Sequence, residues 1–132
     1  YIIMKEDPAR MVHLADFILV ASGTATLMVG LLQKPMVIMY RMKFMTGVFA
    51  RFLVRGVKFF GLVNLILGRE VCPERWQSDA NPETLFELMD RYFQDPQYAA
   101  KVRSELGELR QHLGNKGATK RVAQSLEEFF TS

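Results

Sequence analysis

Acidic side chains are missing from a long stretch of this sequence. None of the 14 aspartates and glutamates lies between Phe17 and Arg69, whereas residues 70–132 carry 11 acids against 8 bases. Seven bases fill the acid-free stretch, namely Lys34, Arg41, Lys43, Arg51, Arg55, Lys58 and Arg69. An anionic neighbour is therefore expected for the first half, and the sign alone does not separate phosphates, phospholipid headgroups and nucleic acid.

Cysteine and long apolar runs are also scarce. The single cysteine, Cys72, has no partner for a disulfide within the chain, so a reducing compartment is the default expectation. No 18 consecutive apolar residues occur, and charges interrupt the first twenty positions, so we expect neither a signal peptide nor a transmembrane span. The sequence begins with Tyr1 rather than methionine, which suggests a piece of a longer protein.

Several catalytic and nucleotide-binding motifs are missing too. The sequence has no G-x-x-x-x-G-K-[ST], no G-x-G-x-x-G after a strand and no G-x-S-x-G, which argues against P-loop enzymes, dinucleotide dehydrogenases and serine hydrolases. His13 and His112 lie far apart, with no cysteine or carboxylate at ligand spacing. We therefore expect no metal ion and no cofactor.

The apolar pattern predicts one α/β domain over residues 1–132. Residues 8–15 resemble the end of a helix, "FILVA" (17–21) and "MVIMY" (36–40) resemble buried strands, and residues 25–33 between them resemble a short helix. Continuous apolar runs are typical of parallel strands that are covered on both faces. The sequence therefore predicts a βαβ unit in a parallel sheet.

Further helices and strands are expected to alternate in the middle of the chain. Apolar residues at 44, 45, 48, 49, 52 and 53 predict an amphipathic helix. Residues 57–70 are expected to hold a third strand, followed by a short helix or turn that ends near Gly68.

Residues 81–132 are expected to form a helical segment. Asn81-Pro82 and Asp95-Pro96 each combine a capping residue with a proline at the first helical position. A third helix is expected after Gly114. The expected buried positions are 85, 88, 89, 92 and 93 in the first helix, 98, 102, 106, 109 and 113 in the second, and 118, 122, 126, 129 and 130 in the third.

The turn Ser22-Gly23-Thr24 joins the first predicted strand to the helix that follows. A helix that begins directly after a parallel strand directs unpaired N–H groups at the carboxyl edge of the sheet, where a glycine allows a phosphate to approach closely. The turn is therefore a candidate phosphate or diphosphate site. Simple helix capping by serine or threonine explains the same residues equally well.

A second candidate cluster lies in "NLILGREVCPE" (64–74). The amide of Asn64 can donate and accept, so it suits a uracil edge or a sugar hydroxyl, and Glu70 suits ribose or sugar hydroxyls. Arg69 suits a phosphate, or it simply pairs with Glu74. A solvated turn with local ion pairs is the favoured interpretation from these residues alone.

The two clusters together resemble a known family. "ASGTATL", "KPMVIMYRMK" and "NLILGREVCPE" are closely similar to the carboxyl-terminal half of bacterial lipid-A-disaccharide synthase, a family 19 glycosyltransferase with the GT-B fold. The resemblance covers nearly the whole chain and is densest over residues 19–77. It implies a Rossmann-like UDP-sugar half, with the nucleotide bound near Ser22, Gly23, Thr24, Arg41, Asn64, Arg69 and Glu70.

The resemblance also implies substrates and partners. The full-length enzyme would join UDP-2,3-diacylglucosamine to 2,3-diacylglucosamine 1-phosphate and release UDP, at the cytoplasmic face of the bacterial inner membrane. An amino-terminal half and an anionic membrane surface are the implied partners, without nucleic acid and without a catalytic residue in this fragment.

Two positions depart from the family pattern. Met28 stands where the family usually has a glutamate that binds the ribose hydroxyls, and a thioether cannot accept two hydrogen bonds. Val63 replaces the proline of the usual "LPN", which leaves Asn64 in place. Met28 favours one alternative, a non-catalytic UDP or phosphate binding module. The basic, apolar stretch 41–60 favours another, a peripheral membrane-binding domain.

Overall fold

The computed structural model describes residues 7–21, 23–40 and 59–114. Three parallel strands form its sheet in the order β1-β2-β3, with β1 at Ile18–Ala21, β2 at Met36–Tyr40 and β3 at Glu74–Trp76. The helices are α1 (Pro8–Leu14), α2 (Ala25–Leu31), α4 (Leu62–Leu67), α5 (Pro82–Gln94), α6 (Pro96–Gly107) and α7 (Leu109–His112), with a 3-10 turn, η1, at Gln77–Asp79. The expected α/β fold with a parallel sheet and flanking helices is confirmed.

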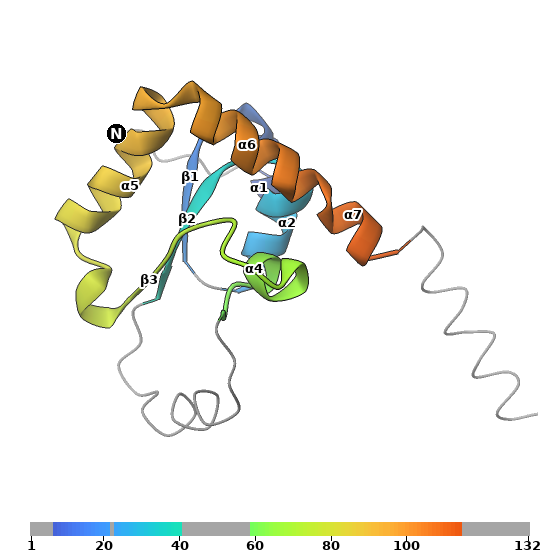
Figure 1. Cartoon of the computed structure of the whole chain (residues 1–132), viewed down its shortest axis with the longest axis horizontal. Helices are drawn as coiled ribbons and strands as arrows, with labels where there is room; N and C mark the ends of the chain where they lie inside the picture. The colour runs from blue at the N-terminus through green and yellow to red at the C-terminus, as the bar shows by residue number, and fades with distance from the viewer. Residues whose placement is uncertain (1–6, 22, 41–58, 115–132) are drawn as a thin grey trace, which may run out of the picture.

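Helices cover both faces of the sheet (Figure 1). Helices α2 and α4 pack on one face and α5 lies across β2 on the other, while α6 passes from α5 over to α2. The central strand β2 is accordingly the most buried, since Met36, Val37 and Ile38 are all inaccessible to solvent. This burial explains why the residues of β2 read as an unbroken apolar run.

The predicted βαβ unit is present. Residue Ile18 pairs with Met36 and Ala21 pairs with Met39, so β1 and β2 run in parallel and their carboxyl ends share one edge of the sheet. The amino end of β2 is also joined to α5, because the hydroxyl of the buried Tyr92 donates to the carbonyl of Met36 at 3.0 Å.

The amino ends of the long helices form as their capping residues predict. Asn81 accepts a hydrogen bond from the N–H of Thr84 at 2.9 Å, and Asp95 accepts one from the N–H of Tyr98 at 2.9 Å. Each cap is followed by a proline at the start of its helix. A capping side chain satisfies one of the helix N–H groups that have no intrahelical acceptor.

The third strand was misplaced by the sequence analysis. Residues 59–70, the described part of the stretch 57–70, contain helix α4 and no strand, and the strand beside β2 is Glu74–Trp76. A polar three-residue edge strand has neither the apolar run nor the alternation that predicts a strand. The expected end of the helix at Gly68 is confirmed, since Gly68 is the left-handed C-cap of α4 with φ of 69°.

Two residues of the expected helical faces are exposed instead. Phe93 is 65% exposed, and its ring lies edge-on to Phe17 with the ring centroids 4.7 Å apart. Leu113 is 42% exposed because α7 already ends at His112. The expected helices at 44–53 and after Gly114 lie outside the described residues.

Candidate functional site

The loop that joins β1 to α2 lies at the carboxyl edge of the sheet. Gly23 and Thr24 are exposed there, and Gly23 has φ of 141°, which L side chains rarely adopt. A Cβ atom added to Gly23 would meet no described atom within 4 Å, so the backbone conformation, and not crowding, favours glycine. The turn therefore presents open backbone to solvent.

Thr26, in the first turn of α2, binds the backbone of this turn through two hydrogen bonds. Its buried hydroxyl donates to the carbonyl of Gly23 at 2.8 Å, and its N–H donates to the same carbonyl at 3.2 Å. Thr24 occupies the N-cap position of α2, yet its side chain makes no capping hydrogen bond with the described residues. Capping by Thr24, the simpler explanation for this residue, is thus not what the structure contains.

An aromatic cluster lies at the same edge. The rings of Tyr40 and Trp76, which end β2 and β3, stack with centroids 3.9 Å apart and an interplanar angle of 7°. Phe60 meets Trp76 edge-on at 4.4 Å. This cluster does not follow from the sequence, because it depends on the register of β3 against β2.

Asn64 lies on α4 and is inaccessible to solvent. Its amide nitrogen donates to the carbonyl of Cys72 at 2.6 Å and to Oε1 of Glu74 at 2.7 Å. Its amide oxygen accepts from the N–H groups of Val71 at 2.8 Å and Cys72 at 3.0 Å. Both donors and both acceptor positions of the side chain are used, so a contact with a nucleotide would require one of these bonds to break.

Glu74 is a buried acidic residue that was not among the site residues predicted from the sequence. The residue is 7% exposed, and its carboxylate also accepts from the N–H groups of Phe60 and Gly61, each at 3.0 Å. Gly61 is the N-cap of α4, so the charge lies at the positive end of that helix. A Cβ atom on Gly61 would lie 2.9 Å from Oε1 of Glu74, which explains the glycine. Only the spacing of "NLILGREVCPE", with a carboxylate ten residues after the amide, signals this contact.

Arg69 and Glu70 lie in the loop that leads into β3. Of the two alternatives for Arg69, a local pair with Glu74 is not present, because the guanidinium of Arg69 binds both carboxylate oxygens of Glu108 at 2.9 and 3.0 Å. Glu70 accepts from the N–H of Glu74 at 3.2 Å and lies 3.6 Å from the guanidinium of Arg75. The loop precedes β3 whereas Gly23 follows β1, so the two clusters lie toward opposite ends of parallel strands.

Of the remaining predicted site residues, only Met28 lies within the described part of the chain. Met28 is half-buried on α2, one turn after the Gly23 loop. Ser22 and Arg41 lie outside the described residues. Over the described ranges, no three histidine, cysteine or acidic side chains gather in a way that would hold a metal ion, and no helix has the length and apolar character to cross a bilayer.

Cys72 is buried beside Asn64 and is chemically quiet. Burial raises the pKa of its thiol to about 12, with the nearby carboxylate of Glu74 acting in the same direction and a backbone hydrogen bond opposing it. The thiolate is the reactive form of cysteine, so this side chain is a poor nucleophile at neutral pH.

A sequence model of the family described as lipid-A-disaccharide synthetase matches residues 1–129. The chain belongs to this family. The lipid-A-disaccharide synthase of Persephonella marina is 35% identical over 116 residues, which are 88% of this chain and 30% of that protein. Lipid-A-disaccharide synthase 1 of Legionella pneumophila is 39% identical over 79% of this chain, and the Myxococcus xanthus synthase is 35% identical over 96% of it.

The chain spans about a third or less of these relatives, since the matched region covers 27% to 33% of their length. It is thus a fragment relative to the family's full-length proteins. The resemblance stated from the three motifs is confirmed at the level of the family.

Proposed function

We propose that this chain is the UDP-sugar half of a glycosyltransferase that joins UDP-2,3-diacylglucosamine to 2,3-diacylglucosamine 1-phosphate and releases UDP in lipid A biosynthesis. Membership of the synthase family supports the reaction class. The observation that carries the placement of UDP is the exposed turn at Gly23, which lies at the carboxyl edge of a parallel sheet and begins a helix. Open parallel sheets bind their ligands at this edge.

In this proposal the diphosphate binds at Ser22, Gly23 and Thr24, with Arg41 following β2 toward the same edge. The hydroxyl of Thr24 suits this role because it is not used to cap α2. Met28, one turn further along α2, is the apolar wall at the ribose end. The partly exposed ring of Trp76, stacked on the buried Tyr40 at the ends of β3 and β2, lies at the same carboxyl edge of the sheet.

The second motif acts in support of the nucleotide site. Asn64 is proposed as a positioning residue, because its amide and Glu74 join α4 to β3. Arg69 and Glu70 hold the loop before β3 through Glu108 and Arg75. The catalytic base belongs to the amino-terminal half, since the acid-free stretch supplies no carboxylate near the turn. Acylated substrates place the whole protein at the inner face of the inner membrane, where the bases of residues 41–58 suit an anionic surface.

Titration calorimetry of the 132-residue chain with UDP and with uridine tests the proposal. UDP is expected to bind more tightly than uridine, and Gly23→Val is expected to weaken UDP at least tenfold because valine disfavours φ of 141°. Gly107→Ala is the matched control, since its added methyl is tolerated on α6 at 3.4 Å from Gln33. Equal affinities for UDP and uridine would contradict the diphosphate site.

A non-catalytic UDP-binding module is the second candidate, and Met28 is the observation that favours it. The full-length protein is expected to release UDP from the two substrates, whereas the 132-residue chain alone is expected to release none. Binding of UDP without turnover by the full-length protein would favour the binding module. Turnover by the isolated chain would contradict the division of labour between the two halves.

A further inference from the structure

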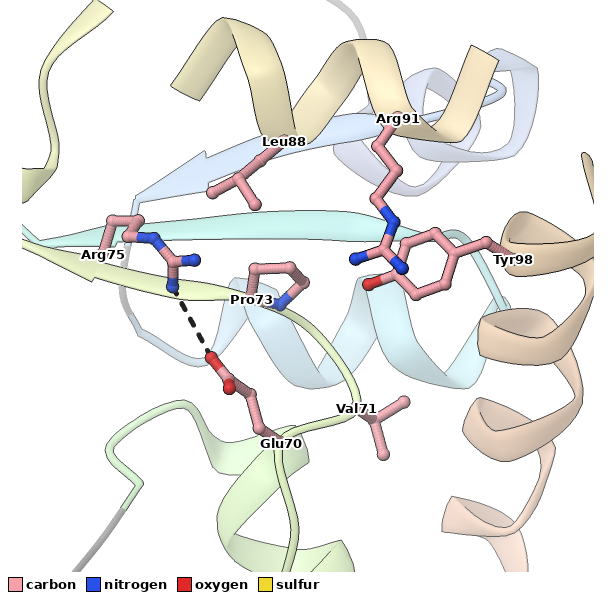
Figure 2. Close-up of a pocket in the computed structure, with 7 residues that line it drawn as sticks. All are labelled: Glu70, Val71, Pro73, Arg75, Leu88, Arg91 and Tyr98. Atoms are coloured by element: carbon pink, nitrogen blue, oxygen red, sulfur yellow. Dashed lines mark ion pairs between the residues drawn. The ribbon is translucent and has the colours of Figure 1, made fainter. Parts of the chain in front are cut away.

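A small polar pocket lies on the outer flank of β3, away from the Gly23 turn. Its volume is about 140 Å³, and it is a half-open hollow lined by the loop before β3, helix α5 and the first turn of α6 (Figure 2). Arg75 and Arg91 reach it from β3 and α5, with Tyr98 of α6 beside them and Glu70 below. Two guanidinium groups from different elements thus share one cavity.

Arg91 is held in place without a counter-ion. Its guanidinium carbon lies 3.8 Å from the centre of the Tyr98 ring, which is a cation–π contact. Within residues 7–21, 23–40 and 59–114, no carboxylate lies within salt-bridge distance of this guanidinium. Stacking occupies the face of the group and leaves its N–H edge to donate.

Arg75 is also oriented before any ligand arrives. Its Nη1 donates to the carbonyl of Glu74 at 2.7 Å and lies 3.6 Å from a carboxylate oxygen of Glu70. Glu70 is half exposed and already accepts from the N–H of Glu74, so it neutralises the pocket only in part. The side chains of the cavity therefore carry two positive charges and one negative charge.

Tyr98 adds no charge at neutral pH. Burial raises the pKa of its hydroxyl, although Arg91 and a hydrogen bond with Tyr92 act in the opposite direction. The hydroxyl proton of Tyr92 is already donated to the carbonyl of Met36, so Tyr98 donates its own proton to Tyr92. A neutral phenol next to two guanidinium groups does not repel an anion.

We propose that this pocket is a binding site for a phosphoryl group, held between the guanidinium forks of Arg91 and Arg75. Paired, pre-oriented guanidinium groups match the oxygens of a phosphate, and the cavity is of a size for one such group. The site is separate from the proposed UDP turn, because it lies beside the beginning of β3 while the turn follows the end of β1. The phosphoryl group can belong to a soluble phosphomonoester or to a lipid headgroup.

Arginine side-chain NMR of the 132-residue chain, with inorganic phosphate as the probe, tests this site. The Nε–H signal that disappears in Arg91→Gln identifies Arg91 in the wild-type spectrum. Phosphate is expected to shift this signal saturably, and Arg75→Gln is expected to raise the phosphate concentration at half-saturation at least fivefold. Arg110→Gln, on the exposed surface of α7, is the matched control and is expected to leave that concentration unchanged.

Two competitors identify the source of the phosphoryl group. Displacement of phosphate by vesicles of phosphatidylcholine with phosphatidic acid, but not by phosphatidylcholine alone, indicates a lipid headgroup. Displacement by glycerol 3-phosphate with no effect of the vesicles indicates a soluble ester, and both results support the site. Acetate that binds as tightly as phosphate, a signal that does not saturate, or a response unchanged in Arg75→Gln would overturn the proposal. None of these results depends on UDP binding.

Discussion

The amide of Asn64 donates to the carboxylate of Glu74 at 2.7 Å, and both side chains are buried between α4 and β3. The contact joins a helix to the strand that follows it, and the same carboxylate receives the N–H groups of Phe60 and Gly61. A single buried charge therefore organises the start of α4. Buried carboxylates are tolerated in proteins where hydrogen bonds satisfy them in this way.

Asn64→Asp is expected to destabilise the chain by about 3 kcal/mol, because it removes two donors and places a second carboxylate beside the buried Glu74. Urea unfolding measures the change. Asn81→Asp is the matched control, since aspartate caps a helix as well as asparagine and the only donor lost is an exposed amide that binds the carbonyl of Ser78. This variant is expected to alter the stability by less than about 0.5 kcal/mol. Equal effects of the two variants would contradict the structural role of Asn64.

Gly30→Ala tests the packing of α2 against the carboxyl-terminal helices. A Cβ atom at Gly30 would lie 2.7 Å from Cδ1 of Leu109 and 2.8 Å from Cγ2 of Val63, so the variant is expected to lose about 1 to 3 kcal/mol through overpacking. Gly107→Ala, also in a helix, has its nearest contact at 3.4 Å and is expected to be neutral or slightly stabilising. Thermal unfolding of both variants provides the comparison, and a stable Gly30→Ala would contradict the close approach of the helices.

Cys72 is expected to make the fold sensitive to alkali. The pKa of its thiol is about 12 in the folded chain, against 9.0 for an unperturbed cysteine. At a pH between 9.0 and about 12, unfolding therefore releases the thiol proton. This contribution to stability is fully present below pH 9.0 and is lost above it, by about 1.4 kcal/mol per pH unit. Burial raises the pKa of Tyr92 as well, which acts in the same direction.

Urea unfolding between pH 8 and pH 11 measures this dependence. Above pH 9.0, Cys72→Ala is expected to reduce the loss of unfolding free energy by about 1.4 kcal/mol per pH unit, the contribution of one proton. This expectation holds whatever the variant does to stability at pH 7. The native thiol is also expected to resist alkylation at pH 8. Rapid alkylation of the folded chain, or an unchanged slope in Cys72→Ala, would contradict the burial of the thiol.

Met28→Glu is expected to tighten UDP binding by about 1 to 2 kcal/mol, because a carboxylate can accept hydrogen bonds from the ribose hydroxyls where a thioether cannot. Calorimetry with UDP measures the gain. Gln111→Glu adds the same charge on the exposed surface of α7 and is expected to leave the affinity unchanged. Weaker UDP binding by Met28→Glu would place the ribose elsewhere.

The parts of the fold that follow from the sequence are those with local signals. The strand at Met36–Tyr40 is apolar at every position, and the caps Asn81 and Asp95 are each followed by a proline that begins a helix. The strand at Glu74–Trp76 has no such signal, because its three residues include two charged ones. It forms through its pairing with β2, which is a long-range contact. Phe93 fits the apolar period of α5 but extends past the edge of the core.

The candidate site was predictable only where backbone conformation is local. The glycine after β1 marks an open turn from sequence alone, and Gly23 indeed has positive φ. The partners of Asn64, Glu74 and Arg69 are set by long-range packing, as the pairing of Arg69 with Glu108 shows across 39 residues. Glu74 was therefore only one of the alternatives that the sequence left open for Arg69, and the tertiary contact with Glu108 replaces it.

The stack of Trp76 on Tyr40 gives the chain a built-in optical reporter. Trp76 is the only tryptophan in the sequence, and its ring lies 3.9 Å from that of Tyr40 at the ends of β2 and β3. Selective excitation of the indole therefore samples this one edge of the sheet and no other part of the molecule. Fluorescence intensity and emission wavelength can follow events at the end of β3 in the unlabelled protein, without a dye, an added residue or a change to the chain.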